Sequence, residues 1–529
     1  MKGGVIVTAT PPTTNGDLHV GHLSGPYLAA DAFKRFQRLN GRPVLYVSSA
    51  DDNQTYVVTT AERLGRDPRE LATEFTEKIK ETLLRADVDI DVFSSPDTDH
   101  ARFVQDFFMS LYKAGAFVER ETDHLYCPEH RRLLFESYVG GVCSICLAKT
   151  KGAICETCGH PNNAIDLIDL ECPYGRDHEL ERKRVRTLFL PLEKYRNQIR
   201  NFYADKWSSW RPHLLHLVDE LLAKPLPEFP ITYVSSWGVP APFPGYGDQV
   251  INVWAEMLPG LIRSTRLAAS KVNSCNADLW LEDSGCELVQ FLGYDNSFFF
   301  AIVHLSLLFA ARPRTILPAA IITNEFYNLD NFKFSTSLGH AIWARDLLNE
   351  YSSDQVRFYL SLSNPENQQT NFTLTEMKQL SCATLIDPWE RLVKEINRSV
   401  DIGPITGDLS DETAAAIEVF ISQMNSAFTT RQFSLRRGAE RISRFVSWMA
   451  DYAERLHLGE PANRHKNARG VNGLWCGMRA ISIAVDPIMP RFAHQLRELL
   501  GVSCSWASLR DRTQIRTAPI PAGILARTR

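Results

Sequence analysis

The sequence has no strong excess of charge of either sign, no apolar run long enough to span a membrane, and no cysteine framework along its whole length. Lys and Arg number 58 against 62 Asp and Glu, a net charge of -4, which argues against a strongly basic nucleic-acid binder. The longest apolar run, 298–311, is interrupted by His304 and Ser306 and is typical of a buried helix. No secretory apolar segment follows Met1. We therefore expect a cytoplasmic protein with no membrane partner.

The composition is that of a globular chain with several domains. Of 529 residues, 44% are hydrophobic and 23% are charged, and the length has room for about three or four domains. Six of the 11 cysteines fall between Cys127 and Cys172. Such local clustering favours a metal site in a reducing compartment over a secreted disulfide scaffold.

The order of apolar runs at the amino terminus predicts a parallel α/β sheet. Residues 5–8 and 44–47 have the pattern of short buried strands, and a helix beginning near Ser24 is expected between them. Asp51 and Asp52 follow the second strand, at the edge where α/β folds bind ligands. We expect further strands at 288–292 and 316–322, mostly helix at 60–120 and 387–500, and a poorly ordered tail from Asp511 that contains Arg512, Arg516, Arg527 and Arg529.

The first candidate site is His19-Val20-Gly21-His22, between the first strand and the helix. Two imidazoles at a helix N-terminus can contact a polyphosphate, and Gly21 lets the backbone approach a flat ligand. The alternative is an incidental pair of histidines on a solvated turn, because His-x-x-His alone is a weak motif.

The second candidate site is Lys333-Phe334-Ser335-Thr336-Ser337. A lysine in a short polar loop can neutralise charge that develops on a phosphate during transfer. A solvated lysine is the alternative, and this motif alone is weaker than the first.

The third candidate site is a metal site with four cysteine ligands. Cys143 and Cys146 form one Cys-x2-Cys pair, and Cys155 and Cys158 form a second one eight residues later. Each pair brings two thiolates to one ion, and two pairs complete a closed, structural, tetrahedral zinc site. The alternative of four free thiols is weak at this spacing. We expect about one zinc ion per chain.

Together, these motifs resemble those of class I aminoacyl-tRNA synthetases, most closely the methionyl-tRNA synthetase family. The resemblance rests on Pro11-Pro12-x-x-Asn15-Gly16-x-Leu18-His19-Val20-Gly21-His22 and on the Lys333 loop, which stands where the family carries Lys-Met-Ser-Lys-Ser. Five further matches follow the family's order: 49–52, 231–240, Val253-Trp254, Phe291-Leu292-Gly293-Tyr294-Asp295 and 354–360. The resemblance spans roughly residues 5–375.

The resemblance implies an α/β fold: a Rossmann-type class I synthetase catalytic domain with a zinc-binding connective insertion, followed by an α-helical bundle domain. The implied divisions are 1–120, first half of the catalytic domain; 121–245, the insertion with zinc knuckles; 246–350, second half of the catalytic domain with the Lys333 loop; 351–380, a stem-contact-like region; 381–510, a helical anticodon-binding-like bundle; and 511–529, a tail.

The resemblance also assigns roles to individual residues. It implies a catalytic role for His19, His22 and Lys333, and ATP binding, with Mg²⁺, by Asn15, Gly21, Gly293, Asp295, Ser335 and Ser337. The implied amino-acid-binding residues are Pro11, Thr13, Asp52, Trp254, Leu261 and Phe300. The Asp52 carboxylate can pair with an α-ammonium group, so the ligand is expected to be an α-amino acid.

The sequence departs from the family where the amino acid is chosen. Pro11 and Thr13 stand where the family's pocket has Leu and Tyr, Leu261 where it has another Tyr, and Phe300 where it has a His. One methylene is worth only ~1–3 kcal/mol of discrimination, so several wall changes should alter the specificity. The alternative is that methionine remains the substrate in a repacked pocket.

Two further departures remove positive charge from the expected phosphate side. Thr336 replaces the second Lys of the family's loop, and Tyr233 replaces an Arg of the family. Donors that stabilise developing charge are often worth about 10²–10³ in rate each. We expect slower adenylation, another cation nearby, or lost activity.

Four residues flank the four-cysteine site. Cys127-x2-His130, Cys172 and His178 resemble an outer knuckle pair that binds a second zinc in some family members, with one Cys replaced by His130 and the other knuckle broken at Gly175. A second zinc with mixed ligands is the less favoured expectation here.

The helical bundle also departs from the family. The segment 452–457 lacks the Trp with which the family reads the anticodon, and Asn397-Arg398 matches its other contact only loosely. Stacking on aromatic side chains is the main way to read single-stranded RNA, which makes tRNA a doubtful partner.

We therefore expect an ATP-dependent ligase that adenylates an amino acid and passes it to a small-molecule amine or hydroxylamine in specialised biosynthesis. Related domains of this kind act in hydrazine formation with cupins, so a separate cupin protein is an expected partner, by analogy only. No dimerisation extension is seen and a monomer is expected. The alternatives are a genuine methionine–tRNA ligase with altered recognition and a non-catalytic ligand-binding relative.

Overall fold

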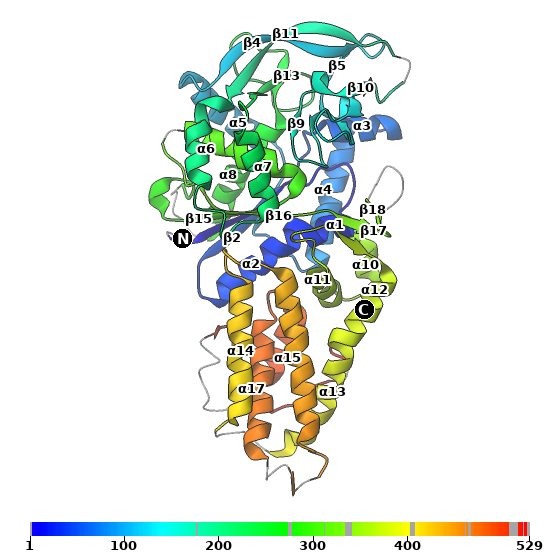
Figure 1. Cartoon of the computed structure of the whole chain (residues 1–529), viewed down its shortest axis with the longest axis vertical. Helices are drawn as coiled ribbons and strands as arrows, with labels where there is room; N and C mark the ends of the chain where they lie inside the picture. Colours follow the sequence, from blue (N-terminus) through cyan, green and yellow to red (C-terminus); the bar gives the residue numbers. More distant parts are fainter. Residues whose placement is uncertain are drawn as a thin grey trace. The chain divides into compact units, whose positions relative to one another are not determined.

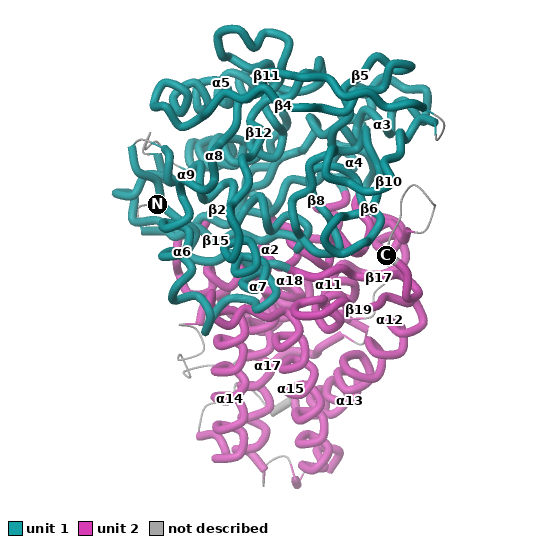
Figure 2. Tube along the Cα trace, turned by 45° about the horizontal axis from the view of Figure 1, so that its top comes forward, with its two compact units in different colours: residues 1–17, 45–81, 90–323 teal, residues 18–44, 82–89, 324–529 magenta. Residues whose placement is uncertain are grey.

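In a computed structural model, the chain folds into two compact units, coloured separately in Figure 2. Unit 1 comprises Met1–Asp17, Leu45–Glu81 and Ile90–Thr323, and unit 2 comprises Leu18–Val44, Thr82–Asp89 and Asn324–Arg529. The structure describes residues 3–175, 178–272, 278–311, 313–333, 341–402, 408–460, 462–463, 467–506, 517–521 and 523–525. The six divisions expected from the sequence stay a prediction.

Unit 1 is built on a five-stranded sheet in the order β16-β15-β1-β2-β3 (Figure 1). Its strands are β1 (Val5–Ala9), β2 (Val44–Ser49), β3 (Val92–Ser94), β15 (Glu287–Gly293) and β16 (Pro318–Asn324). Strands β1 and β15 pair in parallel, as do β2 and β3. All residues of β1 and β2 are buried, as parallel strands covered on both faces require. The parallel α/β sheet predicted from the sequence is confirmed.

Helices complete the α/β part of unit 1. They are α3 (Thr55–Leu64), α4 (Pro68–Arg85, which passes into unit 2), α5 (Thr98–Lys113), α6 (Arg196–Tyr203), α7 (Pro212–Leu222), α8 (Val253–Val272), the π-helical η7 (Phe299–His304) and α9 (Leu305–Ala310). The apolar run at 298–311 is therefore a buried helix, as predicted. Strand β3 interrupts the region predicted to be mostly helical. Within the described part of the chain, no helix has the length and apolar content needed to cross a bilayer.

The connective segment of unit 1 is mostly antiparallel β-structure. A four-stranded sheet has the order β12-β11-β4-β5, and smaller sheets are β10-β6-β7, β13-β14 and β8-β9. The strands are β4 (Val118–Cys127), β5 (Arg132–Leu134), β6 (Gly140–Val142), β7 (Lys149–Lys151), β8 (Ala153–Ile154), β9 (Pro161–Asn162), β10 (Ile168–Glu171), β11 (Glu181–Pro191), β12 (Glu228–Pro230), β13 (Thr232–Val234) and β14 (Gln249–Ile251). Short strands joined by knuckles hold both cysteine-containing clusters.

Unit 2 begins with the helix after β1 and ends in a helical bundle. The first helix starts at Val20, earlier than the predicted Ser24: α1 (Val20–His22) leads through the π-helical η1 (Leu23–Tyr27) into α2 (Leu28–Leu39). Gly25, with non-helical φ and ψ, absorbs the irregularity before Pro26.

The remaining elements of unit 2 form a small sheet and the bundle. The sheet order is β18-β17-β19, with β17 (Tyr327–Leu329), β18 (Phe332–Lys333) and β19 (Thr370–Phe372). The helices are α10 (Ala344–Glu350), α11 (Ser353–Leu362), α12 (Leu374–Ser381), α13 (Asp387–Ile396), α14 (Asp411–Ala427), α15 (Leu435–Arg455), α17 (Ala468–Ala484) and α18 (Pro490–Leu500). The predicted helical region after 387 is confirmed.

The carboxyl-terminal tail is only partly as expected. Ile520 is 2% exposed, its backbone N–H donates to Asn397 Oδ1 at 2.9 Å, and its carbonyl accepts from Asn397 Nδ2 at 2.9 Å. The expectation of a poorly ordered tail is therefore wrong for this stretch, since an apolar side chain and two hydrogen bonds hold it. Arg512, Arg516, Arg527 and Arg529 lie outside the described residues.

Candidate active site and metal centres

Two aspartates at the end of β2 begin the candidate amino-acid site of unit 1. Asp51 is 5% exposed, and its backbone N–H donates to Pro12 O at 3.0 Å. Asp52 Oδ1 accepts hydrogen bonds from Thr14 Oγ1 at 2.9 Å and from Thr76 Oγ1 at 3.2 Å. Burial raises the pKa of Asp52 to about 6, against the opposing effect of these two hydroxyl donors. An ionised, half-buried carboxylate so placed suits an α-ammonium group.

The segment before the first signature contacts the same strand end. Pro11 is buried, and Thr13 forms an isolated parallel bridge with Asp51. Thr13 Oγ1 lies 3.5 Å from Asp51 Oδ2, and Asn15 Nδ2 lies 3.5 Å from Thr60 Oγ1. The structure thus brings Thr13 to the Asp51-Asp52 end of β2, while ATP binding by Asn15 stays a prediction.

Helix α8 brings a second set of predicted residues to this region. Asn53, next to Asp52, donates from Nδ2 to Glu256 Oε1 at 2.7 Å, which joins the end of β2 to the start of α8. Trp254, two residues before Glu256, stacks on Phe299 with ring centroids 3.9 Å apart. Leu261 is fully buried on the same helix. One face of the Trp254 ring therefore packs on η7, and Trp254 also borders a cavity.

His304 contributes to this wall, although the sequence alone did not assign it a role. Its Nε2 lies 2.7 Å from Trp254 O, and its ring lies 4.5 Å from that of Phe300, which is 1% exposed. Burial lowers the pKa of His304 to about 4, so the ring is neutral and Nε2–H donates to the carbonyl. A histidine inside an otherwise apolar run was the signal that could have identified it.

Gly293 is the last residue of β15, and Asp295 follows it in the 3₁₀-helical turn η6 (Tyr294–Asn296). A Cβ atom on Gly293 would lie 2.5 Å from Asp295 Oδ1, so only glycine lets this carboxylate fold back over the strand end. The neighbouring Tyr294 stacks on His213, with ring centroids 3.6 Å apart. ATP binding by Gly293 and Asp295 stays a prediction.

In unit 2, the two signature histidines stack on each other. Their ring centroids lie 3.6 Å apart, and His19 Nδ1 accepts from the backbone N–H of His22 at 3.2 Å. His19 thereby caps α1, which places Gly21 within that turn. Phosphate binding by His19, Gly21 and His22 stays a prediction.

The chain after the second signature pairs with the first one. Val20 N–H donates to Ile342 O at 3.0 Å, Ala344 N–H donates to Leu18 O at 2.9 Å, and His19 forms a bridge with Trp343. The backbone of Lys333 ends β18, opposite Asn328. Ser335, Thr336 and Ser337 lie outside the described residues, so the catalytic and ATP-binding expectations for this loop stay predictions.

The four predicted cysteine ligands come together. The sulfur atoms of Cys143, Cys146, Cys155 and Cys158 all lie within 4.8 Å of one another. Cys146 and Cys155 Sγ are 3.5 Å apart, and Cys143 and Cys158 Sγ are 3.9 Å apart. Tetrahedral zinc with bonds of about 2.3 Å places its sulfurs about 3.8 Å apart. The residues therefore fit a closed zinc site.

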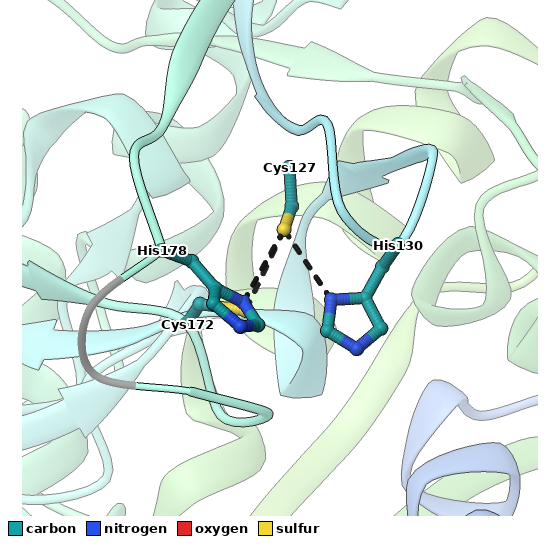
Figure 3. Close-up of side chains that lie close together, drawn as sticks. All are labelled: Cys127, His130, Cys172 and His178. Atoms are coloured by element: carbon teal, nitrogen blue, oxygen red, sulfur yellow. Dashed lines mark hydrogen bonds between the residues drawn. The ribbon is translucent and has the colours of Figure 1, made fainter.

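The outer set is also assembled (Figure 3). Ligand atoms of Cys127, His130, Cys172 and His178 lie within 4.8 Å of one another. Cys127 Sγ lies 3.3 Å from His130 Nδ1, 3.6 Å from His178 Nδ1 and 3.9 Å from Cys172 Sγ. Two thiolates and two imidazoles form a standard tetrahedral zinc set. The structure thus favours the second metal site that the sequence left as the weaker expectation.

Two adjoining cavities lie beside these clusters. One, of about 220 Å³, reaches from Trp254, Asn252 and Phe298 to His160 and Ile145 of the zinc-binding segment. The other, of about 130 Å³, is bordered by Glu136 and Asn162. Tyr233 lines both, with its ring stacked on Phe135 at 4.4 Å between centroids. Tyr233 is thus an aromatic wall that the two cavities share.

Comparison with known proteins identifies the family. The model of the tRNA synthetases class I (M) matches residues 5–399. The chain is 31% identical to the methionine–tRNA ligase of Thermomicrobium roseum over 93% of this chain and 85% of the relative. It is 32% identical to that of Rubrobacter xylanophilus over 72% of this chain and 68% of the relative.

Solved structures share the fold. Methionyl-tRNA synthetase of Mycobacterium tuberculosis in complex with methionyl-adenylate superposes with a TM-score of 0.80 at 19% identity, over 100% of both chains. Its free form gives a TM-score of 0.74 at 18% identity, over 100% of this chain and 99% of the other. The family match over residues 5–399, with the assembled sites, shows that this chain belongs to the class I tRNA synthetases of the methionyl type and is an ATP-dependent ligase.

Proposed function

We propose that this ligase activates an α-amino acid with Mg²⁺–ATP and transfers the aminoacyl group to a small-molecule amine or hydroxylamine. The amino-acid carboxylate attacks the α-phosphorus of ATP, pyrophosphate leaves, and the acceptor then displaces AMP. Asp52 holds the α-ammonium group, and Trp254, Leu261 and Phe300 form the wall for the side chain. The setting implied by the resemblance is hydrazine-forming biosynthesis in the cytoplasm, with a separate cupin protein as partner.

The observation that carries the proposal is the cavity that opens from Trp254 toward the zinc-binding segment. Its volume of about 220 Å³ suits a small organic molecule. Its lining includes the apolar Phe229 and Phe298, the cation Lys224, and three carboxylates: Asp166, Glu220, which lies near His160, and Glu228, which pairs with Arg120. Such a lining, rich in carboxylates, favours a cationic amine as its ligand.

The bundle of unit 2 supports an acceptor other than tRNA. In the segment 452–457, Tyr452 is 6% exposed and stacks on Trp448, so its ring is not available to a splayed base. Glu454 binds Arg391 at 2.9 Å, and Arg398 binds Glu395 at 2.6 Å. Asn397 holds the tail through Ile520.

The second candidate function is methionine–tRNA ligase activity. It is favoured by the relatives, which carry that name at 31% and 32% identity. The two candidates share amino-acid activation and differ in the acceptor.

Pyrophosphate exchange with a panel of amino acids separates these candidates. We expect exchange with an amino acid other than methionine, and transfer to hydroxylamine without charging of total tRNA. Exchange with methionine alone, together with charging of tRNA, would establish the second candidate. No exchange with any amino acid by a metal-loaded protein would instead favour a ligand-binding relative without catalysis.

We further propose that two structural zinc ions are bound, one by Cys143, Cys146, Cys155 and Cys158 and one by Cys127, His130, Cys172 and His178. The support is the approach of each set of ligand atoms to within 4.8 Å. Metal analysis of folded protein should give two zinc ions per chain. The predicted monomeric state is checked by light scattering of the same sample.

A further inference from the structure

We propose that Glu136 binds the acyl acceptor and serves as the general base that deprotonates its amine. This inference rests on the proposed transfer to a small-molecule amine. It assigns the two cavities beside Tyr233 to that acceptor, with its attacking nitrogen beside Glu136 and Trp254 and the rest of the molecule toward the zinc-binding segment.

The Glu136 carboxylate is buried, and only one of its two oxygens has a hydrogen-bond partner among the described residues. The residue is 2% exposed and lies in the 3₁₀-helical turn η2 (Glu136–Tyr138). Oε2 accepts from Thr55 Oγ1 at 3.0 Å, while Oε1 has no hydrogen-bond partner among the described residues. Leaving such an atom buried and unpaired is unfavourable, because it has lost its hydrogen bonds to water. The cost is relieved when a ligand or water donates to Oε1.

A second unpaired polar atom borders the same cavity. Asn162 is 2% exposed, and its Oδ1 faces the Cys143 thiol at 3.7 Å, while its Nδ2 has no partner in the described structure. Its amide can present either atom to the cavity, since the two ends are related by a flip. Glu136 and Asn162 therefore both border the cavity of about 130 Å³, and each has one buried polar atom to which a ligand could form a hydrogen bond.

Glu136 also faces the amino-acid site. Trp254 Nε1 has no hydrogen-bond partner in the described part of the chain, yet its N–H lowers the pKa of Glu136. The two side chains therefore lie near each other. An ammonium group beside them can donate to Glu136. This position is beside the residue that walls the amino-acid pocket.

The surroundings of Glu136 suit a base at neutral pH. Burial raises the pKa of Glu136 to about 7, with Thr55 and Trp254 acting in the opposite direction. The titratable groups that interact with this carboxylate come from four elements: Asp51 after β2, Tyr56 of α3, Tyr138 of η2 itself and Tyr233 of β13. None of these four carries a positive charge that would keep Glu136 ionised and weakly basic.

The local backbone is strained at the same residue. Glu136 has φ +48°, in the left-handed region that a side chain rarely adopts. Gly152 holds it there, since Gly152 N–H donates to Glu136 O at 3.1 Å and a Cβ on Gly152 would lie 2.8 Å from Glu136 N. The zinc-binding segment thereby fixes the carboxylate.

The proposed step involves only Glu136, the acceptor, the aminoacyl adenylate and solvent. Glu136 takes one proton from the acceptor ammonium, and the freed nitrogen attacks the carbonyl carbon of the aminoacyl adenylate. The new C–N bond forms as the bond from carbonyl carbon to phosphate oxygen breaks. AMP leaves and carries the second proton of the nitrogen, and Glu136 returns its proton to solvent.

The test compares two nucleophiles in Glu136→Gln, using the amino acid that gives the fastest pyrophosphate exchange. Cadaverine is a charged amine that needs a base, whereas hydroxylamine is mostly uncharged at neutral pH. General bases contribute typically 10²–10⁴-fold. We expect transfer to cadaverine to fall about 100-fold or more, while exchange and hydroxamate formation change less than about threefold. Glu121→Gln, an exposed carboxylate of β4 that borders neither cavity, is the matched control.

A second variant keeps the inference testable if Glu136→Gln does not fold. Asn163 is exposed and borders both cavities, so Asn163→Trp narrows them. We expect a higher KM for cadaverine with unchanged hydroxamate formation. Equal loss for both nucleophiles, no loss for either, or a wild-type enzyme that uses hydroxylamine but not cadaverine would overturn the assignment of Glu136. Charging of tRNA with no transfer to any amine would instead overturn the proposed function.

Discussion

The imidazole of His178 occupies the space in which a side chain at Gly175 would stand. A Cβ on Gly175 would lie 2.3 Å from His178 Nε2. Cys172 begins a knuckle whose second cysteine position is Gly175, and the absent side chain makes room for a ligand from three residues later. The outer metal set is therefore a knuckle in which His178 replaces the cysteine expected at position 175.

Gly175→Ala should displace His178 and release the outer metal. The methyl group cannot fit at 2.3 Å from the ring, so one of four ligands leaves. We expect metal analysis to fall from two zinc ions per chain to one. Gly247→Ala is the control, since a Cβ there meets no described atom within 4 Å. Retention of both ions in Gly175→Ala would show that His178 is not a ligand.

Cys143→Ser should remove the inner zinc and destabilise unit 1. Cys143 is fully buried, and a closed four-cysteine site contributes folding free energy directly. Each kcal/mol lost lowers Tm by roughly 2–4 °C in a domain of about 150–250 residues, and unit 1 is somewhat larger, so we expect its Tm to fall by a few degrees. Calorimetry and metal analysis check this, with the exposed Cys382→Ser as control. An unchanged zinc content would refute the four-cysteine assignment.

Thr76→Val should shift the pH dependence of amino-acid binding upward. Thr76 Oγ1 donates to the ionised form of Asp52, and such a bond is worth about 1.5–3 kcal/mol, or about one pKa unit or more. Asp52 has a pKa of about 6 in the folded protein, so amino-acid binding weakens as the pH falls through 6. For a shift of about one unit, the KM for the amino acid in exchange should rise about fivefold at pH 6 and about twofold at pH 7.

The same substitution should change the pH dependence of the free energy of unfolding in a definite direction. The pKa of Asp52 is raised in the folded state, so ionising it costs folding free energy as the pH rises from about 4 to about 6. Thr76→Val raises the pKa of Asp52 in the folded protein further, so the free energy of unfolding keeps falling to a higher pH. Thr73→Val, on the same helix with its hydroxyl on Arg69 O, is the control. A KM profile that does not move would exclude Asp52 as the group that binds the ammonium.

Sequence patterns predicted the features that depend on local spacing. The runs at 5–8 and 44–47 are β-branched and apolar without alternation, which only strands buried on both faces require. The inner cysteines were recognisable because two Cys-x2-Cys pairs specify the site within 16 residues of chain. Local geometry is sufficient in both cases.

Features that depend on distant contacts were not predictable in this way. The start of the first helix at Val20 is fixed by pairing of residues 18–20 with 342–344, far along the chain. Glu136 gave no sequence signal, because its burial depends on Thr55 and on the zinc-binding segment folding over it. His178 was a possible ligand from the sequence, but its fit depends on the space left by the absent side chain of Gly175.

Arg357→Met should destabilise unit 2 far more than the matched surface substitution. Arg357 is fully buried, and its Nη2 donates to Asp31 Oδ2 at 2.6 Å, while Nε donates to Ile488 O at 2.8 Å. Burial alone would raise the pKa of Asp31, but Arg35 and Arg357 hold it below 3.8, so the pair contributes stability at neutral pH that is lost only in acid. Removing one partner of such a pair costs about 3–5 kcal/mol.

The matched control is Arg391→Met. Arg391 also binds two carboxylates, Asp451 at 2.6 Å and Glu454 at 2.9 Å, but it is 44% exposed. Exposed pairs contribute about 0–1 kcal/mol because water and salt screen them. Urea denaturation at pH 7 should therefore separate the two variants by at least about 2 kcal/mol. Equal losses would mean that the buried pair of Arg357 with Asp31 stabilises unit 2 no more than an exposed pair does.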